Sequence, residues 1–161
     1  MKYLEWLILA LFLLLAYEVN DAIAYDGYVK MGTSAKSSAS SKVFGLGIQD
    51  TFTKGFIYQA EADILSIPED KTAVTLNGSY RLGVAVDLSS GVFATATTGP
   101  GFITQRDSYL GGYYQFIEDV SIGIKDQFNL FGVGYQHISS AGLETPNRGR
   151  DYFYFKAGVR F

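Results

Sequence analysis

Side chains alternate between apolar and polar along most of the chain after residue 24, which is the pattern of β-strands that separate two environments. Eight segments show it: residues 28–33, 43–52, 57–64, 74–86, 91–98, 120–125, 128–139 and 152–161. Turn-like stretches separate them at 34–41, 53–55, 68–71, 88–91, 99–112, 126–127 and 140–150. No apolar stretch after residue 24 is long enough for a transmembrane helix, which needs about 20 residues. The chain is therefore predicted to be all-β.

The polar parity of these segments combines charges of both signs with amides and glycines. Examples are Glu61, Asp63, Arg81, Lys125, Lys156, Gln49, Gly45 and Gly123. A narrow barrel interior needs this mixture, because buried charges must pair and bulk must stay low. The apolar parity is rich in aromatic residues, as a lipid-facing wall is. We therefore predict an eight-stranded antiparallel transmembrane β-barrel. The alternative is a soluble antiparallel barrel or sandwich, in which the same alternation would face the opposite way.

The two ends of the chain favour the outer membrane. Lys2 precedes an apolar run over residues 7–16, and Ala22-Ile23-Ala24 has the form of a cleavage site, so residues 1–24 are predicted to be a signal peptide. An uncleaved anchor is the alternative. Residues 25–161 are expected to form a single barrel domain. The last strand ends on Phe161 and resembles the terminal strand that the barrel-assembly machinery of bacterial outer membranes recognises.

Composition excludes several other classes of function. The formal net charge is -3, which argues against a nucleic-acid partner. With no cysteine the chain has neither disulfides nor thiolate metal sites, and its single histidine makes a poor transition-metal site. We expect no cofactor and no protein-bound metal, while calcium at lipid phosphates and a homodimer both stay open.

Three residues near the end of the chain are suited to nucleophilic catalysis. His137 and Ser139 follow Tyr135 at the same parity, so both are predicted to face outward, where polar side chains are costly. Asp151 has the outward parity of the next strand. A histidine activates a serine hydroxyl, and a carboxylate orients the imidazole. Glu144 is the alternative acid, and a plain interfacial histidine without catalysis is the alternative to all three.

The stretch His137-Ile138-Ser139-Ser140-Ala141-Gly142-Leu143, continuing through Pro146-Asn147 and Gly149 to Asp151, resembles the active-site hairpin of the PagL family of outer-membrane lipid A deacylases. The resemblance extends to specific residues and spacings over about residues 115–161, and before that it is limited to the strand pattern. Two positions depart from it, since Ser140 stands where asparagine is usual and Asp151 where glutamate is usual. An aspartate can preserve a triad if the backbone shifts slightly, whereas Ser140 alters a hydrogen bond near the site.

The resemblance implies hydrolysis of the ester that links an acyl chain to lipid A, the lipid part of lipopolysaccharide, in the outer leaflet of the outer membrane. It implies Ser139 as nucleophile, His137 as general base and Asp151 as the orienting acid. Candidate oxyanion donors are the Asn147 side chain and the backbone around Ser140 and Gly142. Candidate acyl-groove residues are Tyr135, Phe153 and Phe155, which could equally be simple lipid contacts.

Two further points stay open at this stage. Arg148 and Arg150 could meet lipopolysaccharide phosphates or simply remain solvated. The alternative functions are a non-catalytic structural or adhesive barrel and an outer-membrane phospholipase with the same nucleophile.

Overall fold

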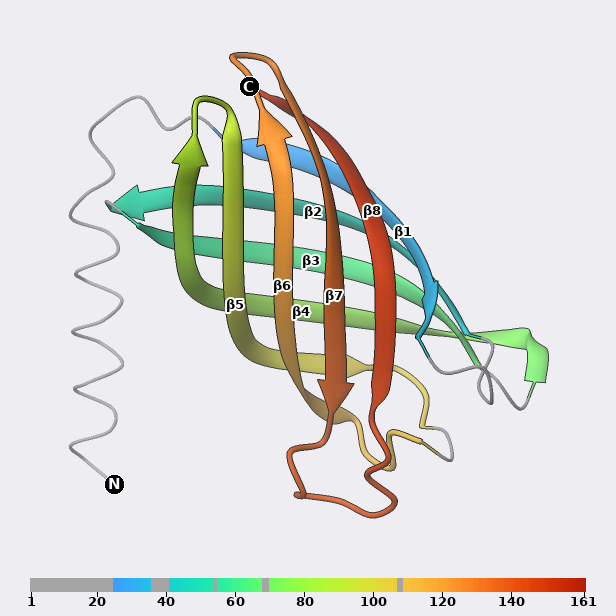
Figure 1. The fold of residues 1–161 in the computed structure, drawn as a ribbon. Helices are drawn as coiled ribbons and strands as arrows, with labels where there is room; N and C mark the ends of the chain where they lie inside the picture. Colours follow the sequence, from blue (N-terminus) through green and yellow to red (C-terminus); the bar gives the residue numbers. More distant parts are fainter. Residues whose placement is uncertain (1–24, 36–40, 54, 68–69, 107–108) are drawn as a thin grey trace, which may run out of the picture.

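The structure is a computed structural model that describes residues 25–35, 41–53, 55–67, 70–106 and 109–161 as one closed antiparallel barrel (Figure 1). Its strands are β1 (Asp26–Ser34), β2 (Lys42–Thr53), β3 (Phe56–Ile67), β4 (Asp70–Ser89), β5 (Val92–Ile103), β6 (Tyr114–Lys125), β7 (Asn129–Ser139) and β8 (Arg150–Arg160). Each strand pairs with its neighbours in chain order, and β8 closes on β1. The predicted fold class is confirmed, while the predicted signal peptide, residues 1–24, lies outside the described residues.

The alternation faces the way that a membrane barrel requires. Lys30 and Arg81 on the polar parity are 0% and 1% exposed, whereas Leu46 and Phe44 on the apolar parity are 56% and 44% exposed. An aqueous barrel would show the opposite arrangement, with its apolar parity in the core. The soluble alternative is therefore excluded by the direction in which the side chains point.

The lumen is held together by paired charges. Lys30 Nζ lies 2.6 Å from Glu61 and 3.0 Å from Asp63, and the Arg81 guanidinium lies 2.9 Å from Glu61 and 3.3 Å from Asp119. All five side chains are at most 1% exposed. Buried charges are tolerated only when they are paired and hydrogen-bonded, so this network links four strands across the lumen.

An apolar plug closes the lumen at the barrel end where β7 finishes. It consists of Val43, Leu65, Ile103, Leu110, Ile117, Ile138 and Tyr152, all buried. Leu110 comes from the β5–β6 loop, and Ile138 and Tyr152 are inward-facing neighbours of the candidate catalytic residues. The plug therefore packs against the inner side of the strand ends whose outer side carries the candidate catalytic residues.

The predicted connection over residues 99–112 was wrong in its first part, because β5 continues to Ile103 and β6 begins at Tyr114. The Gly99-Pro100-Gly101 sequence suggests a turn, yet these residues pair with β6 as far as Phe102. The β4–β5 pairing is interrupted between Ser79–Gly101 and Leu82–Thr98. A proline has no N–H to donate, and a strand accommodates it where the pairing is already interrupted. The loop itself is residues 104–113.

The two barrel ends differ in their connections. Those between β2 and β3, β4 and β5, and β6 and β7 are short and lie at the end where Phe161 pairs with Tyr25 by backbone hydrogen bonds of 3.0 and 3.1 Å. In the β6–β7 turn, backbone N–H groups of Phe128 and Asn129 donate to Asp126 and lower the pKa of its carboxyl. Loops 104–113 and 140–149 lie together at the other end (bottom in Figure 1), which in outer-membrane barrels faces the outside.

Candidate active site

The pairing of β7 with β8 brings the histidine and the acid together. His137 lies directly opposite Asp151, one step from the end of the ladder at Ile138–Arg150. Both side chains have the outward parity, as the sequence predicts. On the other side of β7, Ser139 lies opposite Phe116 of β6. The three candidate residues therefore share one outer face, at the barrel end that carries the long loops.

A hydrogen bond of 2.7 Å joins His137 Nδ1 to Asp151 Oδ1. The Asp151 side chain is only 8% exposed, and that of His137 is 31% exposed. A carboxylate in this position accepts the Nδ1 proton, so the imidazole is held in the tautomer whose Nε2 has a free lone pair. This is the tautomer that a general base needs.

Ser139 is half-buried at the last position of β7. Its Oγ accepts a long hydrogen bond of 3.4 Å from the backbone N–H of Ala141. Among the described contacts none joins Ser139 to His137. Residues two apart on one strand face are separated by about 6.6 Å along the backbone, and catalytic hydrogen bonds are often loose before substrate binds. Ser139 is thus a neighbour of the imidazole on the same face.

Ser140 shapes the loop that follows the serine. The backbone reverses in a tight turn, with positive φ at Ala141 (51°) and Gly142 (78°) and a 2.9 Å hydrogen bond from Leu143 N–H to Ser140 O. The buried Ser140 hydroxyl donates to Glu144 O at 3.1 Å. Its N–H donates to Asn147 Oδ1 at 2.9 Å, which leaves the Asn147 amide nitrogen as the group available to donate. The Ser140 N–H is therefore engaged within the loop.

Glu144, the alternative acid, contacts the neighbouring loop and not His137 in the described contacts. Its carboxylate lies 3.9 Å from the Arg106 guanidinium, and it fills the space that a side chain at Gly112 would need. Loops 104–113 and 140–149 are further joined by a 2.9 Å hydrogen bond from Arg148 N–H to Tyr109 O. Glu144 therefore holds the two loops together, and Asp151 is the acid that contacts His137.

Arg150 does not face the surface that lipid phosphates would reach. It is buried, and its guanidinium donates to Ser66 O at 3.1 Å and to Tyr152 at 3.4 Å. The expectation that Arg150 could meet phosphates is corrected, because its parity on β8 is inward. Arg148, in contrast, is exposed.

Gly149 is required where the loop returns to β8. It has a φ of +65°, and a Cβ on it would lie 2.6 Å from His137 Cε1 and 3.2 Å from Nε2. The missing side chain therefore leaves open the edge of the imidazole that must receive a proton. The sequence contained this glycine, but nothing in the sequence placed it against the histidine ring.

We expect Gly149→Ala to lower kcat/KM for ester hydrolysis by about 10- to 100-fold, because the added methyl displaces the imidazole from its working position. Purified barrels assayed on a soluble ester would show this. Gly55→Ala is the matched control, since Gly55 has a φ of +85° in the turn at the opposite end and a Cβ there meets only Ala85 O at 3.6 Å. Equal activity of both variants would contradict this role for Gly149.

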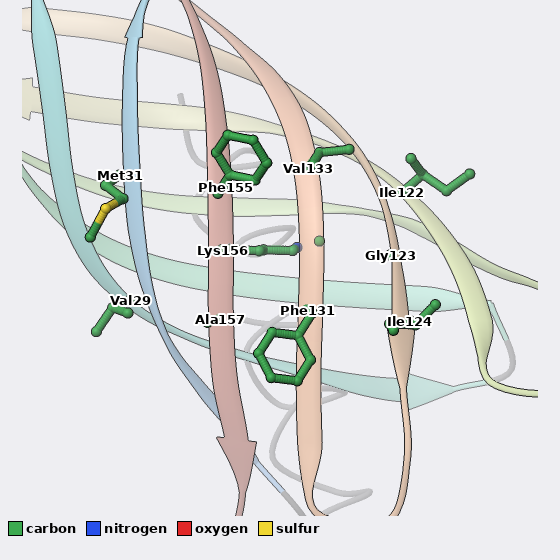
Figure 2. Close-up of a pocket in the computed structure, with 11 residues that line it drawn as sticks. Val29, Met31, Ile122, Gly123, Ile124, Phe131, Val133, Phe155, Lys156 and Ala157 are labelled. Carbon is green, nitrogen blue, oxygen red and sulfur yellow. The ribbon is translucent and has the colours of Figure 1, made fainter.

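An apolar hollow of about 450 Å³ lies on the lipid-facing wall, on the same face as the candidate residues. Figure 2 shows its lining around β7, with the side chains of Phe155, Val133 and Phe131 beside it and Ala157 and Gly123 on the two neighbouring strands. Phe155 and Val133 form a cross-strand pair four residue pairs along the ladder from His137–Asp151, with the outward pair Tyr135–Phe153 between them. Of the predicted groove residues, Phe155 lines this hollow, whereas Tyr135 and Phe153 do not.

Tyr135 and Phe153 instead lie between the hollow and His137 on the outer face of β7 and β8. They are a cross-strand pair whose ring centroids are 5.4 Å apart. The Tyr135 hydroxyl donates to Asp151 Oδ1 at 2.5 Å. The sequence analysis missed this contact, and it also missed Glu118, which lies opposite His137 on β6. Only the strand register could identify these neighbours.

The described residues contain neither a helix long and apolar enough to cross a membrane nor a group of three or more histidines and carboxylates placed to hold a metal ion.

Comparison with known structures defines the class of protein first. The crystal structure of the outer membrane enzyme PagL superposes with a TM-score of 0.70 at 18% identity, covering 83% of this chain and 98% of that one. A designed transmembrane β-barrel gives 0.64 at 9% identity (86% and 95% covered), and Ail, the attachment invasion locus protein of Yersinia pestis, gives 0.52 at 11% (86% and 97%). At these identities the likeness shows the fold, which is that of an eight-stranded outer-membrane barrel.

The family follows from the sequence match. The family model of the lipid A 3-O-deacylases (PagL) matches residues 27–160, so this chain belongs to that family. It is accordingly a protein of the outer membrane, as predicted. No curated protein sequence matches the chain.

Proposed function

We propose that this protein removes an ester-linked acyl chain from lipid A, with Ser139 as nucleophile, His137 as general base and Asp151 as the acid that orients it. The observation that carries this proposal is the 2.7 Å contact of His137 Nδ1 with Asp151 Oδ1 on the outer wall, on the face that Ser139 shares. Membership in the lipid A 3-O-deacylase family supplies the substrate class.

The reaction proceeds in two half-reactions. Ser139 Oγ attacks the ester carbonyl carbon while its proton passes to His137 Nε2. The tetrahedral intermediate collapses as the bond from carbon to the sugar oxygen breaks, and the imidazolium returns the proton to that oxygen. Water then attacks the acyl-serine with His137 again as base, which releases the fatty acid and restores Ser139.

Two donors are suited to the oxyanion of the tetrahedral intermediate. The Asn147 amide is oriented by its Oδ1, which accepts from Ser140 N–H, so its nitrogen is available to donate. The Gly142 N–H lies in the turn that follows Ser139. Donors fixed before the reaction stabilise developing charge at low cost. The N–H of Ser140, already bonded to Asn147, takes no part.

In this proposal the acyl chain that is removed occupies the apolar hollow beside Phe155 and Val133. The substrate enters this hollow laterally from the membrane. Ala157 is cross-strand partner to Phe131 in its wall. We expect Ala157→Phe to lower the ratio of kcat/KM for long-chain over short-chain esters about tenfold, because the new ring fills the hollow. Ala62→Phe, the same change on the outer face of β3, is the control. An unchanged ratio would place the chain elsewhere.

Other contacts of the substrate and the barrel extend the proposal. The exposed Arg148 is the loop arginine available to phosphates of lipopolysaccharide. Recognition of Phe161 by the barrel-assembly machinery and a homodimer stay predictions.

Expression in a bacterium with fully acylated lipid A, followed by mass spectrometry of the lipid extract, tests the proposal. Loss of one hydroxyacyl chain is the expected result. Accumulation of lysophospholipid with intact lipid A would instead indicate a phospholipase. No change in either lipid, with the barrel folded in the outer membrane, would indicate a non-catalytic structural or adhesive barrel.

A further inference from the structure

The hydroxyl of Tyr135 has a partner that its sequence position did not suggest. Tyr135 lies two residues before His137 on β7, at the same outward parity, and its direct partner on β8 is Phe153. Its side chain reaches diagonally across the pair of strands, a distance within the range of an aromatic side chain. There its Oη donates to Asp151 Oδ1 at 2.5 Å.

Two donors therefore converge on a single carboxylate oxygen. Asp151 Oδ1 accepts from Tyr135 Oη at 2.5 Å and from His137 Nδ1 at 2.7 Å. Hydrogen bonds to an ionised carboxylate are shorter and stronger than neutral ones. The nearly buried Asp151 lies close to the lipid-facing surface, where an unsatisfied carboxylate would be costly. The phenol thus both satisfies the carboxylate and fixes the position of Oδ1.

The aromatic ring of Tyr135 is held without its hydroxyl. It packs against Phe153 with centroids 5.4 Å apart and an interplanar angle of 59°. On the other side of β7, Glu118 is the residue opposite His137 in the strand register, whereas the hydrogen bond of His137 Nδ1 goes to Asp151. Removal of the hydroxyl alone therefore isolates its effect on the acid.

We infer that Tyr135 is a positioning residue of this site, whose hydroxyl fixes Asp151 so that the short aspartate side chain orients His137. This inference rests on the proposed function of Ser139, His137 and Asp151. It replaces the acyl-groove role expected for Tyr135. It also accounts for how an aspartate serves at position 151, since a carboxylate on a shorter stem is held in place by a second donor.

The test uses the folded barrel in detergent micelles and two readouts. The first is kcat and KM for lipid A deacylation. The second is the rate at which a fluorophosphonate labels Ser139, a reaction in which the Oγ–P bond forms, fluoride leaves and the serine proton passes to His137. Labelling reports on the activated serine without any acyl chain. Tyr80→Phe, an exposed outward tyrosine on β4, is the matched control, and Ser139→Ala establishes the labelled site.

Tyr135→Phe is expected to lower both kcat and the labelling rate about tenfold and to leave KM unchanged. The Tyr80→Phe control is expected to have wild-type kcat, KM and labelling rate. In the Tyr135→Phe background, Asp151→Glu is expected to recover part of the loss, because the longer acid depends less on the second donor. If Tyr135→Phe labels at the wild-type rate while Ser139 remains reactive, the inference is overturned and the proposed function stands. A raised KM alone would return Tyr135 to the acyl groove. A wild-type protein that is neither labelled nor active would overturn both.

Discussion

Cells that express the Ser139→Ala variant are expected to keep fully acylated lipid A, with the rate of deacylation reduced by at least about 10⁴-fold. The alanine has no oxygen to form the acyl-enzyme, so the whole covalent route is lost. The substitution removes only a 3.4 Å contact with Ala141 N–H from a half-buried position. Barrel stability is therefore expected to change by less than about 0.5 kcal/mol, and the mass spectrum of extracted lipid A reports the activity directly.

Asp151→Asn provides the companion measurement. An amide at position 151 no longer imposes the tautomer that His137 needs, so deacylation is expected to fall by about 10⁴-fold with the fold intact. Glu144→Gln is the matched acid control, because Glu144 contacts Arg106 of the neighbouring loop. If Ser139→Ala retained wild-type deacylation, another nucleophile would have to be sought. If Glu144→Gln failed as severely as Asp151→Asn, the assignment of the acid would be wrong.

The largest expected effect on stability comes from the lumen. Arg81→Met is expected to lower the free energy of unfolding by about 3–5 kcal/mol, because it removes the cation paired with the buried Asp119 and one of the two cations paired with the buried Glu61. Arg81 contacts Glu61 at 2.9 Å and Asp119 at 3.3 Å, and all three are at most 1% exposed. Urea unfolding in lipid vesicles, followed by circular dichroism, measures the change. Fluorescence is unsuitable because Trp6, the only tryptophan, lies in the predicted signal peptide.

Lys125→Met is the matched control for this prediction. Lys125 pairs with Asp87 at 2.9 Å, but the two side chains are 30% and 71% exposed. An exposed ion pair contributes at most about 1 kcal/mol, so this variant is expected to unfold near the wild-type urea concentration. Equal unfolding curves for Arg81→Met and Lys125→Met would show that the lumen network does not hold the barrel together.

The sequence by itself determined which residues share one face of each strand. Lys30 and Arg81 fall on the polar parity of their strands, and His137 and Ser139 share the apolar parity of Val133. Alternation suffices for this, because successive side chains of a strand point to opposite faces. The eight strands were predicted for the same reason. The Gly99-Pro100-Gly101 segment was missed, since local turn chemistry cannot reveal that pairing with β6 continues there, and β6 begins at Tyr114 rather than at residue 120. The burial of Lys30 and Arg81 in the structure is what shows that the polar parity points inward.

Only the tertiary structure decided which groups from different strands meet. Asp151 rather than Glu144 contacts His137 because of the β7–β8 register, and Arg150 turns into the lumen, away from any lipid phosphate. The same register brings the Tyr135 hydroxyl to Asp151, and the return of the loop places Gly149 against the imidazole. Parity along one strand fixes a face, but register between strands fixes neighbours, and register depends on the loops and on the packing of the whole barrel.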